Sequence, residues 1–326
     1  MEAKKKRRML LVLIVIFLIA EFLISLLVGK YTLRLESLWE REEQALRIFW
    51  TLRFPRTCMA AFAGFGLGVV GMIYQTIFRN PLASPDMIGV SSGAGAGAAF
   101  AILFLPGSAF YITGCAFAGS LLAVILALGL SMLVPAKGSH TIVLSGLAIH
   151  SLAQTILMVL KMTADPEKEL AAIEYWLMGS FHGITGKDME VTLPLTIVCM
   201  AVLFLLYRQI LLLSMEEEEA ALLGVPVRKI RFLILMLATL VVAAIVCVTG
   251  MIGFVGLLAP HCARLITGNY GSTALWLSGI LGSVLLLGAD MLARSVANSE
   301  LPVSIFTTLM GVPFLIWLMV KRRNEI

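Results

Sequence analysis

Long apolar runs separated by short polar segments fill most of the chain. Each run approaches the ~20 residues that an α-helix needs to cross the hydrocarbon core of a bilayer. The pattern therefore predicts an all-α polytopic membrane protein with about ten transmembrane helices. The runs cover residues 9–29, 57–78, 87–105, 110–134, 141–160, 191–207, 232–249, 251–266, 272–292 and 303–320.

Two of these runs need a closer look. Residues 232–266 are too long for one span, and Gly250, Gly253, Gly256 and Pro260 interrupt them, so two helices are expected there. The first run follows five basic residues, 4–8. It is longer than the ~7–15-residue core of a signal peptide, and no small-x-small cleavage site follows it, so it is interpreted as an anchor.

Composition supports a membrane protein. The chain has 326 residues, of which 60% are hydrophobic and 14% charged, whereas soluble domains carry about 25% charged residues. The mean hydropathy is +0.96. The five cysteines are scattered, form no CxxC pair and are interpreted as small buried residues.

Lysine and arginine set the expected orientation, because cytoplasmic loops carry the excess of positive charge. Placing both termini in the cytoplasm puts most basic residues there, including residues 4–8 and 321–323. The outer side still keeps an unusual number of basic residues. These are Lys30, Arg34, Arg41, Arg47, Arg53, Arg56, Lys161, Lys168, Lys187 and Arg294.

Glycines inside the apolar runs predict close helix packing. Residues 52–98 contain a glycine-rich span with Gly64, Gly66, Gly68 and Gly71, followed by the polar turn RNPLASPD. Small residues allow helix backbones to approach one another in lipid.

Nothing in the sequence indicates enzyme chemistry. Walker A, HExxH, GxSxG and Rossmann patterns are absent, and the four histidines are far apart. No catalytic, cofactor-binding or metal site is therefore expected. Asp290 is interpreted as a helix-end cap or salt-bridge partner, and Glu21, near the outer end of the first span, is expected to reach the interface.

Residues 208–231 form the most interpretable loop. Ser214 and Glu217 have the spacing of a capping box, the acidic residues 216–219 suit a helix N-terminus, and Gly224 and Pro226 can end the helix. The loop is thus a short helix and turn projecting from the membrane. Both a solvated connector and a docking helix for a soluble partner fit this pattern.

Arg53 and Arg56 precede a span and lie three residues apart, so on a helix they share a face. They can bind lipid headgroups or be neutralised by Glu36, Glu40, Glu42 and Glu43. Alternatively, they can receive carboxylates of a docking protein, for which the guanidinium group is well suited.

Eight segments along the chain carry recognisable motifs. They are LRFPR (52–56), QTIFRNPLASPDMIGVSSGA (75–94), LSGLAI (144–149), YWLMGS (175–180), EEEAALLGV (217–225), GMIGFVGLLAPHCARLITG (250–268), LLLGADMLAR (285–294) and ELPVSIFTTLMGVPFLIWLM (300–319). In this order they resemble the motifs of the FecCD-type permeases, the membrane subunits of ABC importers for iron-siderophores, haem and cobalamin. The first span and the linker after it carry no such motif.

The resemblance implies a type II ABC importer permease fold, with residues 1–326 as a single transmembrane permease domain and 208–231 as its ATPase-docking loop. One departure is SMEEEE, where the family often has a glycine before a glutamate pair. The implied binding-protein docking residues are Arg53, Arg56 and Arg294. The implied ATPase-docking residues are Glu216, Glu217, Glu218, Glu219, Ala220, Leu223, Gly224, Val225 and Pro226. The implied pathway residues on the fifth helix are Leu144, Gly146, Ile149, Ser151 and Gln154.

The resemblance also implies partners. These are a second permease subunit, identical or paralogous, two cytoplasmic ATPase subunits that use the ATP, and an extracytoplasmic substrate-binding protein. The chain would lie in the cell membrane of a prokaryote and bind no nucleic acid. It would import an iron-siderophore or a related chelate by alternating access.

The main alternative is a secondary transporter driven by an ion gradient. Such a transporter needs charged or broken-helix sites near the bilayer midplane. Glu21 and the break near Gly250 are the candidates. A membrane enzyme would require paired catalytic groups, which the sequence does not offer.

Overall fold

The computed structural model describes residues 2–29, 35–133, 139–215, 217–224, 226–268, 271–297 and 299–323, and the described chain is helical without strands. Within it, seven helices are long and apolar enough to cross a membrane, and three more are apolar but shorter: Val90–Phe104, Val255–Thr267 and Val303–Trp317. Together they correspond to the ten predicted spans. The helices are α1 (Glu2–Leu27), α2 (Leu35–Trp39), α3 (Glu43–Ile48), η1 (Phe49–Arg53), α4 (Phe54–Ile77), η2 (Pro85–Ile88), α5 (Val90–Phe104), α6 (Ala109–Leu133), α7 (Ser139–Thr163), α8 (Glu169–Leu177), α9 (Gly186–Leu205), α10 (Tyr207–Leu212), α11 (Glu217–Leu222), α12 (Val227–Thr249), α13 (Val255–Thr267), α14 (Ser272–Ser295) and α15 (Val303–Arg323).

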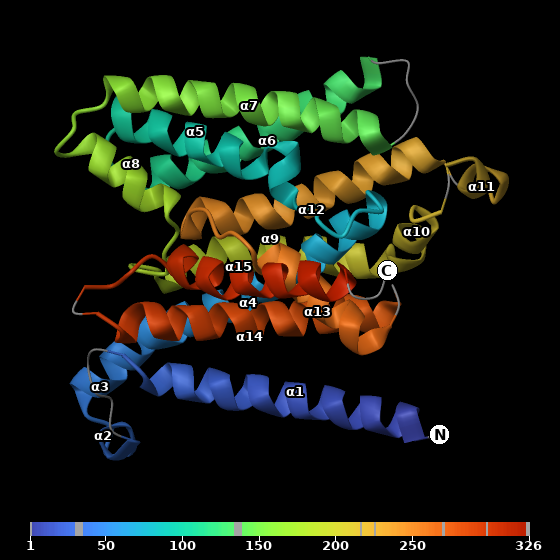
Figure 1. Cartoon of the computed structure of the whole chain (residues 1–326). Coiled ribbons are helices and arrows are strands. Elements are labelled where there is room, and N and C mark those ends of the chain that lie inside the picture. The colour runs from blue at the N-terminus through green and yellow to red at the C-terminus, as the bar shows by residue number, and fades with distance from the viewer. Residues whose placement is uncertain are drawn as a thin grey trace.

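The long helices run roughly parallel or antiparallel to one another in a bundle (Figure 1). Helix α7 lies at the top of the view over α5 and α6. Helix α12 packs against α6 on one side and against α9 and α4 on the other. Helix α14 packs on α4 and α13. Helix α1 lies at the bottom against α14. Both termini lie at the end of the bundle that carries α10 and α11, and α2 and α3 lie at the opposite end.

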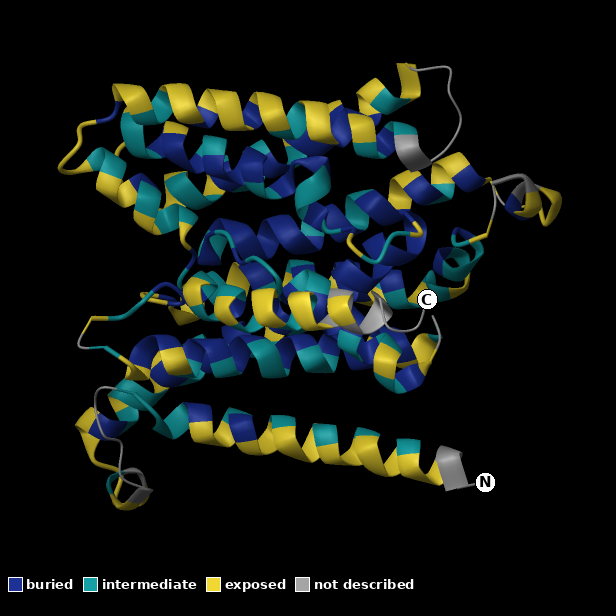
Figure 2. Ribbon diagram, viewed as in Figure 1, coloured by how far each residue is buried: buried dark blue, intermediate teal, exposed yellow. Residues whose placement is uncertain are grey.

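The core follows the middle of the bundle. Dark blue, buried segments dominate α4, α12 and α14, whereas α1 and α7 expose apolar side chains along their outward sides (Figure 2). Exposed leucine, isoleucine and phenylalanine side chains on a spanning helix suit contact with lipid.

Glycine contacts join α4 to α14, as the glycine pattern predicted. A β-carbon at Gly64 would overlap the carbonyl of Gly282, and one at Gly282 would overlap the carbonyl of Gly64. Ser278 Oγ donates to the Gly68 carbonyl at 2.6 Å. This close backbone approach is the packing mode that small residues permit in lipid.

The break between α12 and α13 confirms the expected pair of helices in residues 232–266. Helix α12 ends at Thr249, Gly250 has a φ of 71°, and Phe254 has a φ of 67° before α13 begins at Val255. A side chain at Gly250 would overlap the carbonyl of Trp176. Glycine is therefore required there both for its backbone angle and for space.

The expectation for Glu21 was wrong. Its side chain does not reach a surface but is buried, with an exposed fraction of 7%, and it packs beside Gly288 of α14. Glu21 Oε2 has no hydrogen-bond partner within the described chain. The missing side chain at Gly288 provides the space that a carboxylate needs on this face.

Candidate functional sites

The three predicted docking arginines do come together, at the end of the bundle that carries α2 and α3. Arg53 closes the π-helix η1, Arg56 lies in the first turn of α4 and Arg294 in the last turn of α14. Pro55 explains the π-helix, because it has no N–H for the carbonyl of Thr51. The hydrogen bonds of η1 span five residues instead of four, as the Phe54 N–H shows by donating to the Phe49 carbonyl.

Arg56 pairs with two carboxylates. Its Nε and Nη2 donate to Asp290 Oδ1 at 2.9 and 2.8 Å, and its Nη1 donates to Glu300 Oε2 at 2.8 Å. The Asp290 side chain is fully buried, so this pair is shielded from water. Of the two interpretations of Asp290, a helix-end cap or a salt-bridge partner, the salt bridge is confirmed.

Arg294 and Arg53 connect this arginine cluster (Arg53, Arg56 and Arg294) to α1 by hydrogen bonds. Arg294 Nε lies 3.3 Å from Asp290 Oδ2, and its Nη2 donates to Ser25 Oγ at 2.5 Å. Arg294 Nη1 donates to the Val28 carbonyl at 3.0 Å, and Arg53 Nη1 donates to that same carbonyl. The C-terminal turn of α1 is thereby fixed to α4 and α14.

Arg53 and Arg294 are buried and Arg56 is mostly buried, all three engaged within the chain. Neutralisation by Glu36, Glu40, Glu42 and Glu43 was one of the interpretations that the sequence left open, and for Arg56 it is wrong. Asp290 and Glu300, which are 234 and 244 residues away from Arg56, take that place. Glu300 begins one of the family-like segments, but nothing in the sequence indicated its pairing with Arg56, and the docking role of the arginines stays a prediction.

Glu300 lies between α14 and α15 and also contacts His182 Nδ1 at 3.1 Å through Oε2. Burial alone would raise the pKa of Glu300, but its hydrogen bond to Arg56 and the charge of that residue outweigh burial and hold the pKa below its ordinary value. Glu300 is therefore ionised at neutral pH.

A cavity of about 320 Å³ opens beside His182, under α8. At this end of the bundle, the Ser180 N–H donates to the Thr249 carbonyl at 2.7 Å, and the Val303 N–H donates to the Gly179 carbonyl at 3.0 Å. Three segments distant in sequence are thus joined at this end. The polar and aromatic lining includes Tyr175, Trp176, Ser180, His182 and Thr249.

The predicted ATPase-docking segment lies at the opposite end and projects from the bundle (Figure 1). Ala220 is buried, Leu223 and Gly224 are exposed, and Leu222 is 89% exposed. Pro226 precedes α12. Glu219 is exposed and Glu217 begins α11. Glu216 and Val225 lie outside the described residues, as do the side chains of Glu217 and Glu218.

The capping box predicted from Ser214 and Glu217 was wrong. Ser214 Oγ donates backwards, to the Leu211 carbonyl at 2.6 Å, and therefore closes the turn after α10. The short helix expected before Gly224 is present as α11. Helix α10, which the sequence did not reveal, precedes it.

The predicted pathway residues lie along α7. Leu144, Ser151 and Gln154 are exposed, and Ile149 is half-buried. Gly146 is buried instead, because the backbone of Met87 and Ile88 in η2 packs on it. The exposed face combines apolar side chains with hydroxyl and amide groups.

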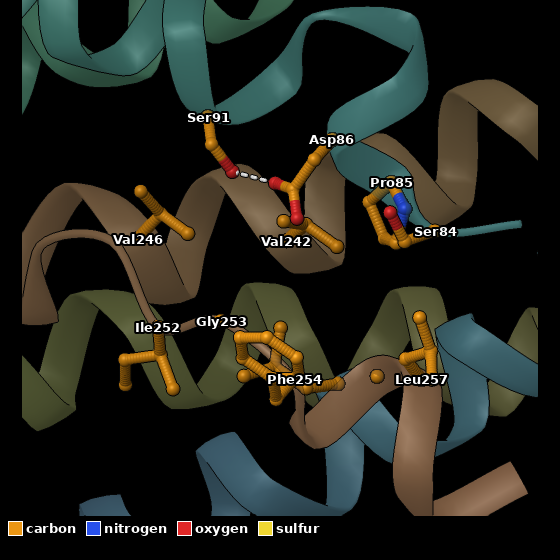
Figure 3. A pocket seen from close by; sticks show the side chains of 12 residues that line it. Ser84, Pro85, Asp86, Ser91, Val242, Val246, Ile252, Gly253, Phe254 and Leu257 are labelled. Atoms are coloured by element: carbon orange, nitrogen blue, oxygen red, sulfur yellow. Dashed lines mark hydrogen bonds between the residues drawn. The ribbon is translucent and has the colours of Figure 1, made fainter. Parts of the chain in front are cut away.

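A second cavity, of about 210 Å³, lies between η2, α12 and the start of α13. Figure 3 shows Asp86 at its upper edge with Ser91, whose hydroxyl donates to Asp86 Oδ1, and Phe254 below. The cavity thus lies where the turn before α5 meets the break between α12 and α13. Among the described residues, no group of three or more histidine, cysteine, aspartate or glutamate side chains could hold a metal ion.

Comparison with known proteins gives a consistent result. The model of the FecCD transport family matches residues 15–321. A solved structure, described as an inward-facing conformation of a proposed metal-chelate type ABC transporter, superposes with a TM-score of 0.87 at 31% identity. That match covers 96% of this chain and 99% of the other.

The relatives are named for different cargoes. The chain is 38% identical to the cobalamin import system permease of Halobacterium salinarum, covering 86% of this chain and 75% of that protein. It is 32% identical to the molybdate import system permease of Haemophilus influenzae, covering 91% of each. It is 33% identical to the hemin transport system permease of Yersinia pestis, covering 100% of this chain and 99% of that protein.

Proposed function

The chain belongs to the FecCD transport family, and on that premise we propose that it imports a metal chelate by alternating access, driven by a separate ATPase. The match over residues 15–321, together with the superposition on a metal-chelate type transporter, is the observation that carries the proposal. Residues 1–326 then form one transmembrane permease domain, which is not itself an enzyme.

The α10–α11 segment is the proposed contact with the ATPase. Leu222 and Leu223 are exposed at the tip of a projecting helix, where they have no lipid to contact if this end faces the cytoplasm. Exposed leucines with a charged neighbour, the exposed Glu219, suit a docking contact with an apolar centre. Burial of Ala220 holds the base of the tip against the bundle, so force on the tip reaches α12.

The proposed pathway follows the exposed face of α7. Ser151 Oγ donates to the Leu147 carbonyl at 2.9 Å, and Gln154 is exposed beside it. Polar groups on a spanning helix are disfavoured against lipid and favoured against protein or water. A second permease subunit, identical or paralogous, facing α7 would enclose this surface as a central pathway.

The arginine cluster is the proposed site for the substrate-binding protein, at the end opposite to α11. Arg56 and Glu300 reach the surface there, and Asp290 holds the Arg56 guanidinium in a fixed orientation. Both termini then lie in the cytoplasm, and the chain crosses the inner membrane of a prokaryotic cell several times.

The proposed cargo is an iron-siderophore or a related chelate such as haem or cobalamin. Relatives named for cobalamin, molybdate and hemin show that the family scaffold accommodates chemically different cargoes. A pathway lined mainly by apolar, hydroxyl and amide groups of α7 provides few charged contacts. Selection of the cargo is then left mainly to the binding protein.

Two features favour the alternative, a secondary transporter driven by an ion gradient. Glu21 is a buried carboxyl group in a spanning helix, and the chain between α12 and α13 is broken. Both features are typical of ion-coupled sites. Their separation in the bundle, with Glu21 on the peripheral α1, argues against one common site.

ATPase docking can be tested with the exposed tip. Replacing Leu222 and Leu223 by aspartate is expected to abolish co-purification of the cognate ATPase and stimulated ATP hydrolysis, while the chain remains monodisperse. Trp39→Asp, at an equally exposed position in α2 at the opposite end of the bundle, is the matched control and should leave both unchanged. Full ATPase binding by the double variant would contradict the proposed role.

A further inference from the structure

The two carboxylates that hold Arg56 differ in kind. Asp290 is fully buried on α14, receives two N–H groups of Arg56 and also faces Arg294. Glu300 is 20% exposed, lies in the connection between α14 and α15, and receives one N–H of Arg56. Only the second partner can be reached from solvent without opening the bundle.

The same oxygen of Glu300 serves a second partner. Oε2 lies 2.8 Å from Arg56 Nη1 and 3.1 Å from His182 Nδ1, and the His182 side chain is 62% exposed. Glu300 therefore bridges a mostly buried guanidinium and an exposed imidazole. A small rotation of the glutamate side chain exchanges one contact while keeping the other.

The backbone around Glu300 is anchored. The Leu301 N–H donates to the Ala293 carbonyl at 3.0 Å, and the Val303 N–H donates to the Gly179 carbonyl at 3.0 Å. Loss of the contact to Arg56 consequently moves a side chain rather than the connection between α14 and α15.

We propose that Glu300 is an exchangeable internal occupant of Arg56, which a carboxylate of the docking protein replaces, while Asp290 holds the guanidinium in place and His182 keeps the released Glu300. This proposal rests on the proposed docking of a substrate-binding protein at this end. Glu300 then determines which partners dock, because only a group that matches a carboxylate in charge and geometry displaces it.

The physical reason is conservation of charge. Exchanging one carboxylate for another leaves the charge around Arg56 unchanged, and a partly exposed ion pair is weak enough to be exchanged. A neutral or cationic group would leave the buried guanidinium with one partner fewer, which is costly. The site thus rejects non-acidic surfaces without any steric barrier.

The test uses the full chain in detergent and phenylglyoxal, which modifies accessible guanidinium groups. In Glu300→Gln, the rate at Arg56 is expected to rise roughly two- to fivefold, the range for loss of a partly exposed ion pair. The rate at Arg47, an exposed arginine at the same end, should stay unchanged and serves as the internal reference. Glu167→Gln, an exposed carboxylate at this end, is the control variant.

Glutarate is the soluble carboxylate probe in the second arm. It should protect Arg56 in Glu300→Gln and protect it less in the wild type, where Glu300 competes. An unchanged rate at Arg56 in Glu300→Gln, or a raised rate without protection by glutarate, would overturn the proposal. If Glu300→Gln is not monodisperse, Glu300→Asp replaces it, with an intermediate rate expected because the shorter side chain withdraws from Arg56.

This result is separate from the proposed function, because the isolated chain needs no partner for the reaction. Absence of ATP-dependent uptake would contradict the proposed import function. It would leave the proposed displacement of Glu300 from Arg56 untouched. Arg56 protected by Glu300 in a chain that transports normally would support both.

Discussion

At the scale of single residues, Asp290 is the centre of the polar cluster. It is fully buried, lies within a spanning helix and contacts both Arg56 and Arg294. A buried charge of this kind is tolerated only when it is paired, and removal of one partner leaves the others buried and unpaired. Asp290 is therefore more important for the structure than for recognition.

Replacing Asp290 by asparagine is expected to lower the free energy of unfolding by about 3–5 kcal/mol, the cost of leaving a buried charge without its partner. Unfolding in detergent, followed by the fluorescence of the five tryptophans, measures the loss. Glu167→Gln is the control with no expected change. Stability of Asp290→Asn equal to that of the wild type would contradict the pairing.

Glu300 predicts a dependence on pH. Because its pKa is depressed in the folded protein, the stability that it contributes is present above the ordinary pKa of a glutamate and is lost as the pH falls through the depressed value. The wild type should therefore be more stable than Glu300→Gln at pH 7. The margin should vanish at lower pH, and a margin independent of pH would exclude an ionised Glu300.

At the scale of elements, the contact between α4 and α14 organises the bundle. Gly64 and Gly282 face each other, and hydroxyl groups of Ser278 and Ser283 donate to carbonyls of α4. Since lipid supplies no hydrophobic force between helices, this close fit and these hydrogen bonds hold the pair together.

Gly282→Ala is expected to cost about 1–3 kcal/mol, because its β-carbon would overlap the carbonyl of Gly64 and force the helices apart. Gly114→Ala on α6 is the matched control, because a β-carbon there meets nothing within 4 Å. That control should gain up to about 1 kcal/mol of helix propensity. Thermal unfolding compares the two, and equal effects would contradict the close packing.

The elements themselves were largely predictable. The ten apolar runs match helices, including the break after Gly250, because length and apolarity follow from the bilayer thickness. Helices α8 and α10 and the π-helix η1 were not predicted. They are short, and their formation depends on neighbouring segments rather than on their own pattern.

The site was predictable only in part. The sequence singled out Arg53, Arg56 and Arg294 through family motifs, but not their burial or their partner Glu300. Pairing between residues 244 positions apart depends on how α4 meets the start of α15. A hydropathy pattern contains no information on that contact.

At the scale of the whole molecule, the two ends of the bundle differ in kind. One end carries the termini and the exposed leucine tip of α11, and the other carries the arginine cluster and the cavity beside His182 (Figure 1). Helix α7, with its mixed exposed face, runs between them. An importer that binds its ATPase at one end and its substrate-binding protein at the other requires two ends that differ in this way.

The most direct test of the central claim is uptake into proteoliposomes that contain the chain with its cognate ATPase and binding protein. Labelled ferric siderophore, haem and cobalamin would be offered in turn. The account predicts uptake of at least one chelate that requires ATP and the ATPase and is lost in the Leu222 and Leu223 aspartate variant. Uptake driven by an ion gradient in vesicles without the ATPase would contradict it.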